Sequence, residues 1–176
     1  MTESKTLILG GVRSGKSRLA ERLAIESGLA VTLIATATAQ DDEMRARIAA
    51  HRVRRPKAWR VVEEPLRLAA ALQQTATAKR CVVVDCLTLW LTNLLLAEDA
   101  AALEREQAAL LATLPALPGR ILLVSNETNM GITPLGELAR RYCDAAGQLH
   151  QALAHCCDRV ILTVAGLPHV LKGASA

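Results

Sequence analysis

Continuous runs of apolar residues recur along the chain, and stretches with helical spacing of apolar residues separate them. Such runs predict strands that are buried on both faces, as in a parallel sheet. They lie at 6–9, 31–35, 81–85, 120–125 and 160–164. A shorter strand is expected at 60–62. Because the runs are regularly separated by helical segments, the pattern is that of strands connected by crossover helices.

The segments between the strands repeat apolar residues every three or four positions, which predicts helices. We expect them at 16–26, 41–55, 66–78, 87–96, 100–112 and 134–157. Pro56 ends the second, because the residue before a proline avoids helical geometry. Strands that alternate with helices predict an α/β fold with a doubly wound, mainly parallel sheet and helices on both faces. The 176 residues fit a single domain, 1–176.

The segment between the first strand and the first helix is rich in glycine and ends in Gly-Lys-Ser. Its residues are Gly10, Gly11, Val12, Arg13, Ser14, Gly15, Lys16 and Ser17. Glycines let backbone N–H groups turn inward around a phosphate, and the positive end of the following helix faces the same point. Strand, loop and helix together predict a P-loop, and hence a P-loop NTPase-like fold. In it, Lys16 would reach the β- and γ-phosphates of a nucleotide.

The strand at 81–85 ends in a carboxylate, Asp85. A buried apolar strand with a terminal aspartate is typical of a Walker B segment, which serves Mg²⁺ in P-loop enzymes. We therefore predict that Ser17 and Asp85 hold Mg²⁺, with Asp85 acting directly or through water. The alternative is an acid that only ends a strand.

Small and polar residues follow two of the expected strands, at 36–40 and 126–134. Open α/β sheets bind their ligands at the carboxyl ends of the strands. Both loops are therefore candidates for the same site as the P-loop.

A basic run accompanies the helix expected at 41–55. It comprises Arg45, Arg47, Arg52, Arg54, Arg55, Lys57 and Arg60, and His51 lies within it. Such a run is often an ordinary solvated face. A nucleic-acid partner is not expected, because the net charge is only +4 and aromatic residues are 2% of the chain. With a P-loop nearby, we favour arginines that bind the phosphates of a second substrate or a leaving pyrophosphate.

The five cysteines lack the spacing of zinc ligands. They are Cys81, Cys86, Cys143, Cys156 and Cys157, and we expect reduced, buried thiols. Their odd number, and the lack of a leader-like pattern in residues 1–5, favour the cytoplasm. The longest apolar run, at 87–96, is interrupted by polar residues and too short for a bilayer, so no membrane insertion is expected.

Together these motifs resemble the bifunctional adenosylcobinamide kinase/adenosylcobinamide-phosphate guanylyltransferases of cobalamin biosynthesis. The resemblance runs nearly from end to end, and its most specific part is Arg-Ile-x-x-His and Arg-Pro beside a P-loop. Further matching pieces are Ile34-Ala35-Thr36-Ala37, Asp42-Glu43-Met44, Trp59-Arg60-Val61-Val62-Glu63, Asp85-Cys86-Leu87-Thr88, Thr92-Asn93-Leu94-Leu95, Ser125-Asn126-Glu127 and Gly131-Ile132.

The resemblance implies phosphorylation of adenosylcobinamide by ATP or GTP, then transfer of GMP from GTP to give adenosylcobinamide-GDP and pyrophosphate. It implies that His51 carries GMP covalently, with Lys16 as the second catalytic residue. A neutral imidazole, with a reference pKa of about 6.5, can attack the α-phosphate near pH 7. The implied partners are a corrinoid substrate and further copies of the chain, for example in a trimer. The implied nucleotide contacts, besides the P-loop, are Ala35, Thr36, Ala37, Arg52, Val53, Arg54, Arg55, Glu63 and Asp85.

Two other hypotheses remain open from the sequence. A simpler P-loop kinase for a small alcohol would need Lys16, Ser17 and Asp85 but no histidine nucleophile. A nucleotide-dependent regulatory protein would use the basic helix to bind a partner. For His51 itself, the alternative is a hydrogen-bonded histidine at the edge of the core. The remaining histidines, His150, His155 and His169, are expected to be structural or exposed to solvent.

Overall fold

The computed structural model describes residues 4–38, 56 and 58–174, and these contain one seven-stranded sheet. Its order is β3-β2-β4-β5-β1-β6-β7, and all neighbouring strands are parallel except β6 and β7. β1 therefore lies inside the sheet, between β5 and β6. In chain order the strands are β1 (Lys5–Gly10), β2 (Ala30–Ala35), β3 (Arg60–Glu63), β4 (Arg80–Asp85), β5 (Arg120–Asn126), β6 (Arg159–Val164) and β7 (Leu167–Lys172).

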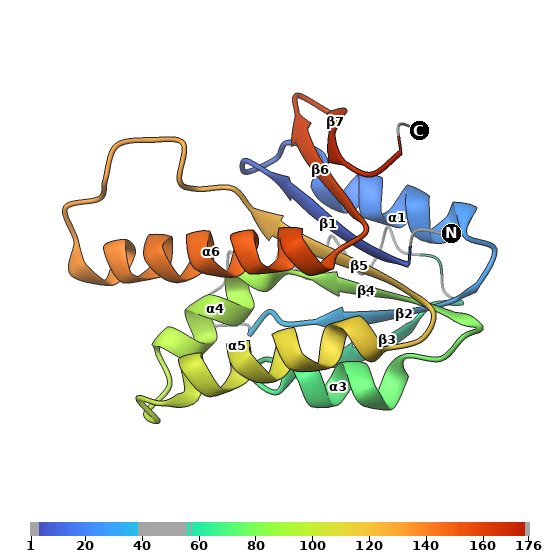
Figure 1. The fold of residues 1–176 in the computed structure, drawn as a ribbon, viewed down its shortest axis with the longest axis horizontal. Coiled ribbons are helices and arrows are strands. Elements are labelled where there is room, and N and C mark those ends of the chain that lie inside the picture. Colours follow the sequence, from blue (N-terminus) through green and yellow to red (C-terminus); the bar gives the residue numbers. More distant parts are fainter. Residues whose placement is uncertain (1–3, 39–55, 57, 175–176) are drawn as a thin grey trace.

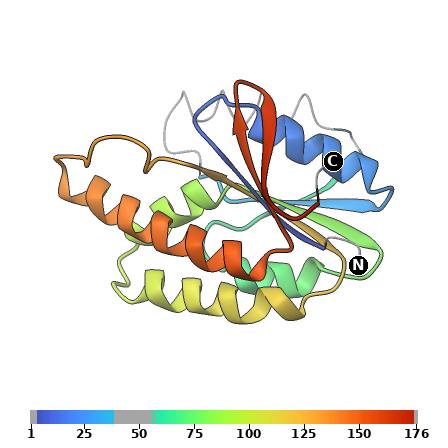
Figure 2. The ribbon, with the colours of Figure 1, turned by 45° about the horizontal axis from the view of Figure 1, so that its top comes forward.

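Helices cover both faces of the sheet (Figures 1 and 2), and α1 lies on the face opposite to α3, α4, α5 and α6. This confirms the predicted doubly wound, mainly parallel α/β fold. The helix expected at 41–55 lies outside the described residues. Within the described part of the chain, no helix has the length and apolar character needed to cross a membrane. The helices are α1 (Lys16–Glu26), α3 (Leu68–Thr75), α4 (Leu87–Leu95), α5 (Ala102–Thr113) and α6 (Glu137–Cys156), with a 3-10 turn η1 (Leu114–Ala116).

Each face of the sheet has its own aliphatic core, because side chains alternate along a strand. In β5, Leu122 and Val124 pack with Leu19 of α1, whereas Ile121 and Leu123 join the larger core under the other helices. The same alternation in β1 and β4 fixes which side chains reach α1. The two cores thus determine the face on which each residue at the carboxyl edge lies.

Strand β7 was not expected from the sequence. Its residues are mostly exposed and include Pro168, so they show neither an apolar run nor clear alternation. It is an edge strand, where proline is tolerated. Ala165 and Gly166, with φ of 51° and 82°, form the turn that pairs it with β6 in antiparallel fashion. The helix predicted at 134–157 also begins later, at Glu137, because Gly136 is in an extended conformation.

The cysteines are all free, but only Cys81 and Cys157 are buried, whereas the other three are partly exposed. The expectation of reduced thiols is therefore consistent with the structure, and the expectation that all are buried is wrong. Cys81 lies in β4 under α1, and Cys157 ends α6.

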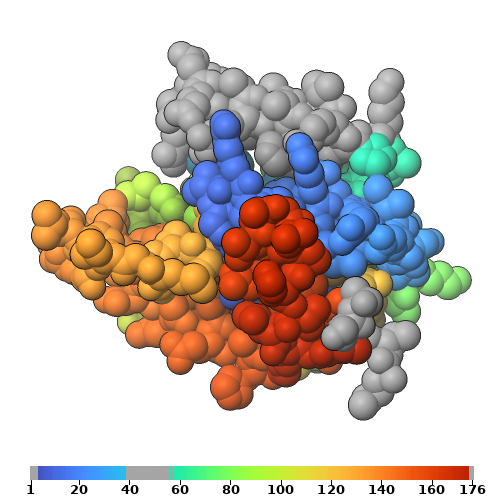
Figure 3. Space-filling view, turned by 90° about the horizontal axis from the view of Figure 1, so that it is seen from above, coloured from blue at the N-terminus to red at the C-terminus, as the bar shows by residue number. Residues whose placement is uncertain are grey.

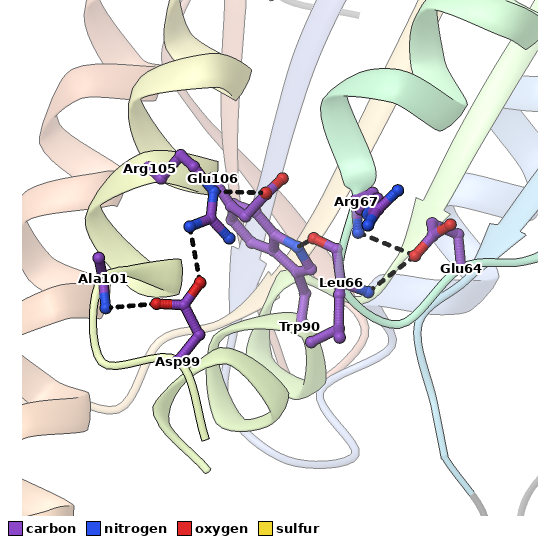
Figure 4. Close-up of polar contacts among 8 residues, drawn as sticks. All are labelled: Glu64, Leu66, Arg67, Trp90, Asp99, Ala101, Arg105 and Glu106. Atoms are coloured by element: carbon purple, nitrogen blue, oxygen red, sulfur yellow. Dashed lines mark hydrogen bonds and ion pairs between the residues drawn. The ribbon is translucent and has the colours of Figure 1, made fainter. Parts of the chain in front are cut away.

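The tryptophan of α4, Trp90, connects this helix to the turn between β3 and α3 (Figure 4). Trp90 is fully buried, and its Nε1 donates a hydrogen bond of 2.7 Å to the Leu66 carbonyl. The backbone N–H groups of Leu66 and Arg67 donate to Glu64 Oε1 at 2.9 and 2.8 Å. The turn between β3 and α3 is therefore fixed by Trp90 at the Leu66 carbonyl and by Glu64 at the N–H groups of Leu66 and Arg67. These bonds position the end of β3.

Replacement of Trp90 by alanine should lower the free energy of unfolding by about 3–5 kcal/mol, because it removes a large buried ring and the partner of the Leu66 carbonyl. Trp59 is the matched control, since it is the only other tryptophan and is partly exposed. Urea unfolding of Trp90→Ala and Trp59→Ala measures both effects. Equal losses in the two variants would contradict the role of Trp90.

Candidate active site

The P-loop has the geometry that a phosphate-binding turn requires. The chain leaves β1 at Gly10, and α1 begins at Lys16 with Gly15 as its N-cap. Arg13 and Gly15 have φ of 56° and 100°, and the Ser14 N–H bonds to the Gly11 carbonyl at 3.2 Å. The first N–H groups of α1 have no partner within the helix, so they are available to an anion at this end.

The loop has no room for a side chain at Gly10. A Cβ there would lie 2.4 Å from the Thr163 carbonyl oxygen and 2.5 Å from Ser14 Oγ. The β6–β7 hairpin supports the loop, since the Gly166 N–H donates to the Ser14 carbonyl at 2.9 Å. Figure 3 shows this hairpin, in red, against the blue N-terminal part of the chain. The strand that sequence reasoning missed thus helps to position the P-loop.

Lys16 is buried at the mouth of the loop, with 7% of its surface exposed. Its Nζ donates to the Gly11 carbonyl at 2.6 Å. Burial lowers the pKa of Lys16 from 10.5, and Coulombic interactions with Cys86 and Asp85 act in the opposite direction. The ammonium group is therefore held where a phosphate oxygen could replace the carbonyl as its partner.

Asp85 lies on the same face of the sheet as the P-loop helix. It follows Cys81 and Val83 in alternation, and both of these pack in the core under α1. Asp85 pairs in register with Val124 of β5, and β5 in turn pairs with β1. The structure therefore brings the predicted Walker B carboxylate to the edge that carries Lys16 and Ser17, both in the first turn of α1.

The residues after β2 and β3 meet at this edge as well. Ala35 pairs in register with Glu63, and the Glu64 N–H donates to the Ala35 carbonyl at 3.0 Å. Glu63 is exposed, whereas Thr36 is fully buried. Ala35, Thr36, Ala37 and Glu63 therefore lie at the ends of neighbouring strands, and their contacts with a nucleotide stay a prediction.

The hydroxyl of Thr36 already forms hydrogen bonds within the protein. It donates to the Cys86 carbonyl at 2.6 Å and accepts from the Cys86 N–H at 3.0 Å, joining the ends of β2 and β4. Asn93 Nδ2 donates to the carbonyls of Thr36 at 2.8 Å and Pro65 at 3.1 Å. Sequence reasoning assigned Asn93 no role, because its partners are 57 and 28 residues away.

His150 has a structural role, which is one of the two possibilities expected from the sequence. It is 6% exposed, and its Nε2 lies 2.8 Å from Ser125 Oγ. Burial lowers its pKa from 6.5, and Glu127, whose Oε2 is 3.8 Å from Nδ1, partly opposes that shift. At neutral pH the imidazole is therefore uncharged. It fixes the last residues of β5 against α6.

The predicted residues His51, Arg52, Val53, Arg54 and Arg55 lie outside the described residues. Their proposed roles stay predictions. The P-loop, Asp85 and the ends of β2 and β3 lie at one carboxyl edge of the sheet, where open α/β sheets bind their ligands.

The sequence matches the family of cobinamide kinase / cobinamide phosphate guanyltransferase over residues 6–171. The chain belongs to this family. The predicted family and enzyme class are thereby confirmed. The family's description names a cobinamide substrate, so a corrinoid as substrate is implied.

Two relatives match the chain over nearly the whole of their own length. The bifunctional adenosylcobalamin biosynthesis protein CobP of Pseudomonas aeruginosa PAO1 is 67% identical over 169 residues, covering 96% of this chain and 98% of that one. CobU of Escherichia coli K12, described in the same words, is 39% identical over 179 residues, covering 94% and 98%. A solved structure from Pyrococcus horikoshii OT3 is 11% identical, with a TM-score of 0.52 and coverage of 98% and 87%, and shows likeness of fold alone.

Replacement of Gly10 by alanine should lower the free energy of unfolding by about 1–3 kcal/mol, because the new methyl group collides with the Thr163 carbonyl. Gly11→Ala is the matched control, since no atom lies within 4 Å of a Cβ at that position. Urea unfolding without nucleotide compares the two variants. The packing described here is wrong if Gly11→Ala costs as much as Gly10→Ala.

Proposed function

We propose that this protein phosphorylates the aminopropanol hydroxyl of adenosylcobinamide with ATP or GTP and then transfers GMP from GTP to the product. The end products are adenosylcobinamide-GDP and pyrophosphate. The observation that carries the proposal is the P-loop, with buried Lys16, at the same sheet edge as Asp85 in a chain of this family.

In the kinase step, the P-loop N–H groups and the Lys16 ammonium bind the β- and γ-phosphates. The hydroxyl oxygen of the acceptor forms a bond to the γ-phosphorus, and the bond from that phosphorus to the β–γ bridging oxygen breaks. The negative charge that develops on the leaving nucleoside diphosphate is stabilised by Lys16 and the loop. The conformation of the loop supports this role, since Arg13 and Gly15 have the positive φ of a tight turn directly before the first residue of α1.

The residues at this edge fit Mg²⁺. Ser17 offers a hydroxyl in the first turn of α1, and Asp85 offers a carboxylate whose charge acts on Lys16. Mg²⁺ favours oxygen ligands and is commonly bound by one or two protein groups together with substrate phosphates. When bound, Mg²⁺ would supply positive charge to the phosphates.

In the transferase step, a neutral His51 attacks the α-phosphorus of GTP. The bond to the α–β bridging oxygen breaks, pyrophosphate leaves, and a His51–GMP intermediate forms. The phosphate of the acceptor then takes GMP and releases the histidine. Arg52, Arg54 and Arg55 bind the phosphates, and Glu63 accepts from the guanine N1–H and amino group. The exposure of Glu63 at the end of β3 supports that last assignment, as does its pairing with Ala35.

We also propose a homo-oligomer. Leu87, Leu91 and Leu94 of α4 are buried in the core, so they are not free to form its interface. The loop before α6 supports it better, because Ile132 and Leu135 are 98% and 97% exposed. Large apolar side chains at such exposure are typical of contacts between proteins.

Incubation of the purified protein with Mg²⁺ and α-labelled GTP tests the transferase. We expect an acid-labile GMP adduct on the wild type and none on His51→Ala, because a phosphorus–nitrogen bond to imidazole forms only at the nucleophile. His155→Ala is the matched control, since His155 is exposed on α6 and its imidazole Nδ1 lies 3.2 Å from the carbonyl oxygen of Gln151 in the same helix. Intact-mass analysis before and after acid treatment reads out the adduct.

No adduct on the wild type, together with phosphorylation of a small alcohol, would replace the proposal by a monofunctional P-loop kinase. An adduct that survives in His51→Ala would assign the nucleophile elsewhere. Neither an adduct nor phosphorylation with any acceptor would favour a regulatory binding protein.

A further inference from the structure

A carboxamide at the carboxyl end of β5 lies beside the P-loop. Asn126 is the last residue of β5, and its register partner in β1 is Gly10, where the P-loop begins. Along β5 it follows Leu122 and Val124 in alternation, and both pack in the core under α1. Its side chain is therefore on the same face as α1, which carries Lys16.

The same residue lies next to Asp85. β5 runs between β1 and β4, and Asp85 pairs with Val124, two positions before Asn126. Two residues of a strand span about 6.6 Å, so the carboxamide lies one pleat further toward the edge than the carboxylate. Asn126 thus occupies the strand end between the P-loop and Asp85.

The carboxamide of Asn126 is uncommitted, in contrast to the two other asparagines of the chain. Asn93 Nδ2 holds the Thr36 and Pro65 carbonyls, and Asn129 Nδ2 donates to the Cys143 carbonyl at 2.9 Å. Among the described residues, the Asn126 carboxamide makes no hydrogen bond, although the residue is partly buried. Its two N–H donors are therefore available to a ligand at the edge.

The backbone around Asn126 is fixed, which sets the point from which its side chain leaves the strand. The Asn126 N–H donates to Thr88 Oγ1 at 2.8 Å, and the next N–H, of Glu127, donates to the Gly10 carbonyl at 2.9 Å. Thr88 belongs to α4 and Gly10 to the P-loop, so the strand end is tied on both sides. A ligand that binds the carboxamide therefore has to order only the side chain and not the backbone.

We propose that Asn126 is a catalytic residue of the kinase step, whose carboxamide donates a hydrogen bond to an oxygen of the γ-phosphoryl group. This rests on the proposed function, because it concerns the nucleotide in the P-loop. During transfer the acceptor oxygen bonds to the γ-phosphorus and the bond to the β–γ bridging oxygen breaks, with that electron pair staying on the diphosphate. The acceptor's hydroxyl proton passes to an oxygen of the transferred group.

The donor matters more for this reaction than for GMP transfer. In the kinase step the γ-phosphoryl oxygens carry the changing charge, so a fixed donor stabilises the transition state. In GMP transfer the reacting bond is at the α-phosphate, and the γ-phosphoryl group leaves unchanged within pyrophosphate. With saturating GTP, loss of the contact should therefore leave the rate of adduct formation nearly unchanged.

The test compares Asn126→Ala and Asn126→Asp with the wild type. Asn126→Asp keeps the size of the side chain and replaces its donors by a negative charge. The control is Thr128→Ala, because the exposed Thr128 lies in the same loop and its hydroxyl donates only to Asn129 Oδ1. The assays are steady-state kinetics of cobinamide phosphorylation with saturating Mg²⁺ and nucleotide, and formation of the GMP adduct from saturating GTP.

We expect kcat for phosphorylation to fall about 100-fold in both Asn126 variants, in the range found when one transition-state donor is removed. The rate of adduct formation should change less than threefold in the same samples, which also shows that the variants are folded. Thr128→Ala should match the wild type in both assays.

A kinase kcat within threefold of the wild type, or equal losses in both reactions, would overturn the role of Asn126 and leave the proposed function standing. A wild-type protein that does not phosphorylate cobinamide would overturn both. The ratio between the two reactions therefore distinguishes the failure of the inference from the failure of the function.

Discussion

Phosphate binding in this protein depends on the convergence of backbone N–H groups at the end of β1. The turn that makes this possible needs positive φ at Arg13 and Gly15 and cannot accept a side chain at Gly10. Its position in space is set by the sheet, because β1 is paired on both sides, with β5 and β6. The order β4-β5-β1 then places Asp85 and Asn126 beside it. The chemistry at this edge therefore follows from strand order and from one glycine-dependent turn.

The loops at the edge are held by hydrogen bonds rather than by apolar packing. Thr36 binds both backbone groups of Cys86, Asn93 binds two loop carbonyls, and Thr88 binds the end of β5. Each of these bonds satisfies a polar group that would be costly to bury unpaired. They leave Lys16, Asp85 and Asn126 as the side chains for which we propose contacts with the ligand. A rigid frame with few uncommitted side chains is the arrangement that electrostatic catalysis requires.

Much of this architecture could be predicted from the sequence, because it depends on local patterns. The buried strands are apolar runs, and the P-loop is one continuous motif ending in Lys16 and Ser17. Asp85 could be placed because it directly follows a buried strand. The family itself was recognisable from short pieces around His51 and Arg55.

The features that could not be predicted depend on contacts between distant segments. Strand β7 is exposed and contains Pro168, so its pairing with β6 has no local signal. The hydrogen bonds of Asn93 and Thr88 join α4 to segments far away in the chain. A sequence does not show which asparagine side chain forms such a bond. The contrast between Asn93, Asn129 and Asn126 therefore became visible only in the folded structure.

Binding of the triphosphate at this edge would be visible in a crystal structure of the protein with Mg²⁺ and a non-hydrolysable ATP analogue. We expect β- and γ-phosphates in the P-loop, with Lys16 Nζ bonded to a phosphate oxygen instead of the Gly11 carbonyl. A triphosphate bound elsewhere on the protein, with Lys16 still on Gly11, would contradict it.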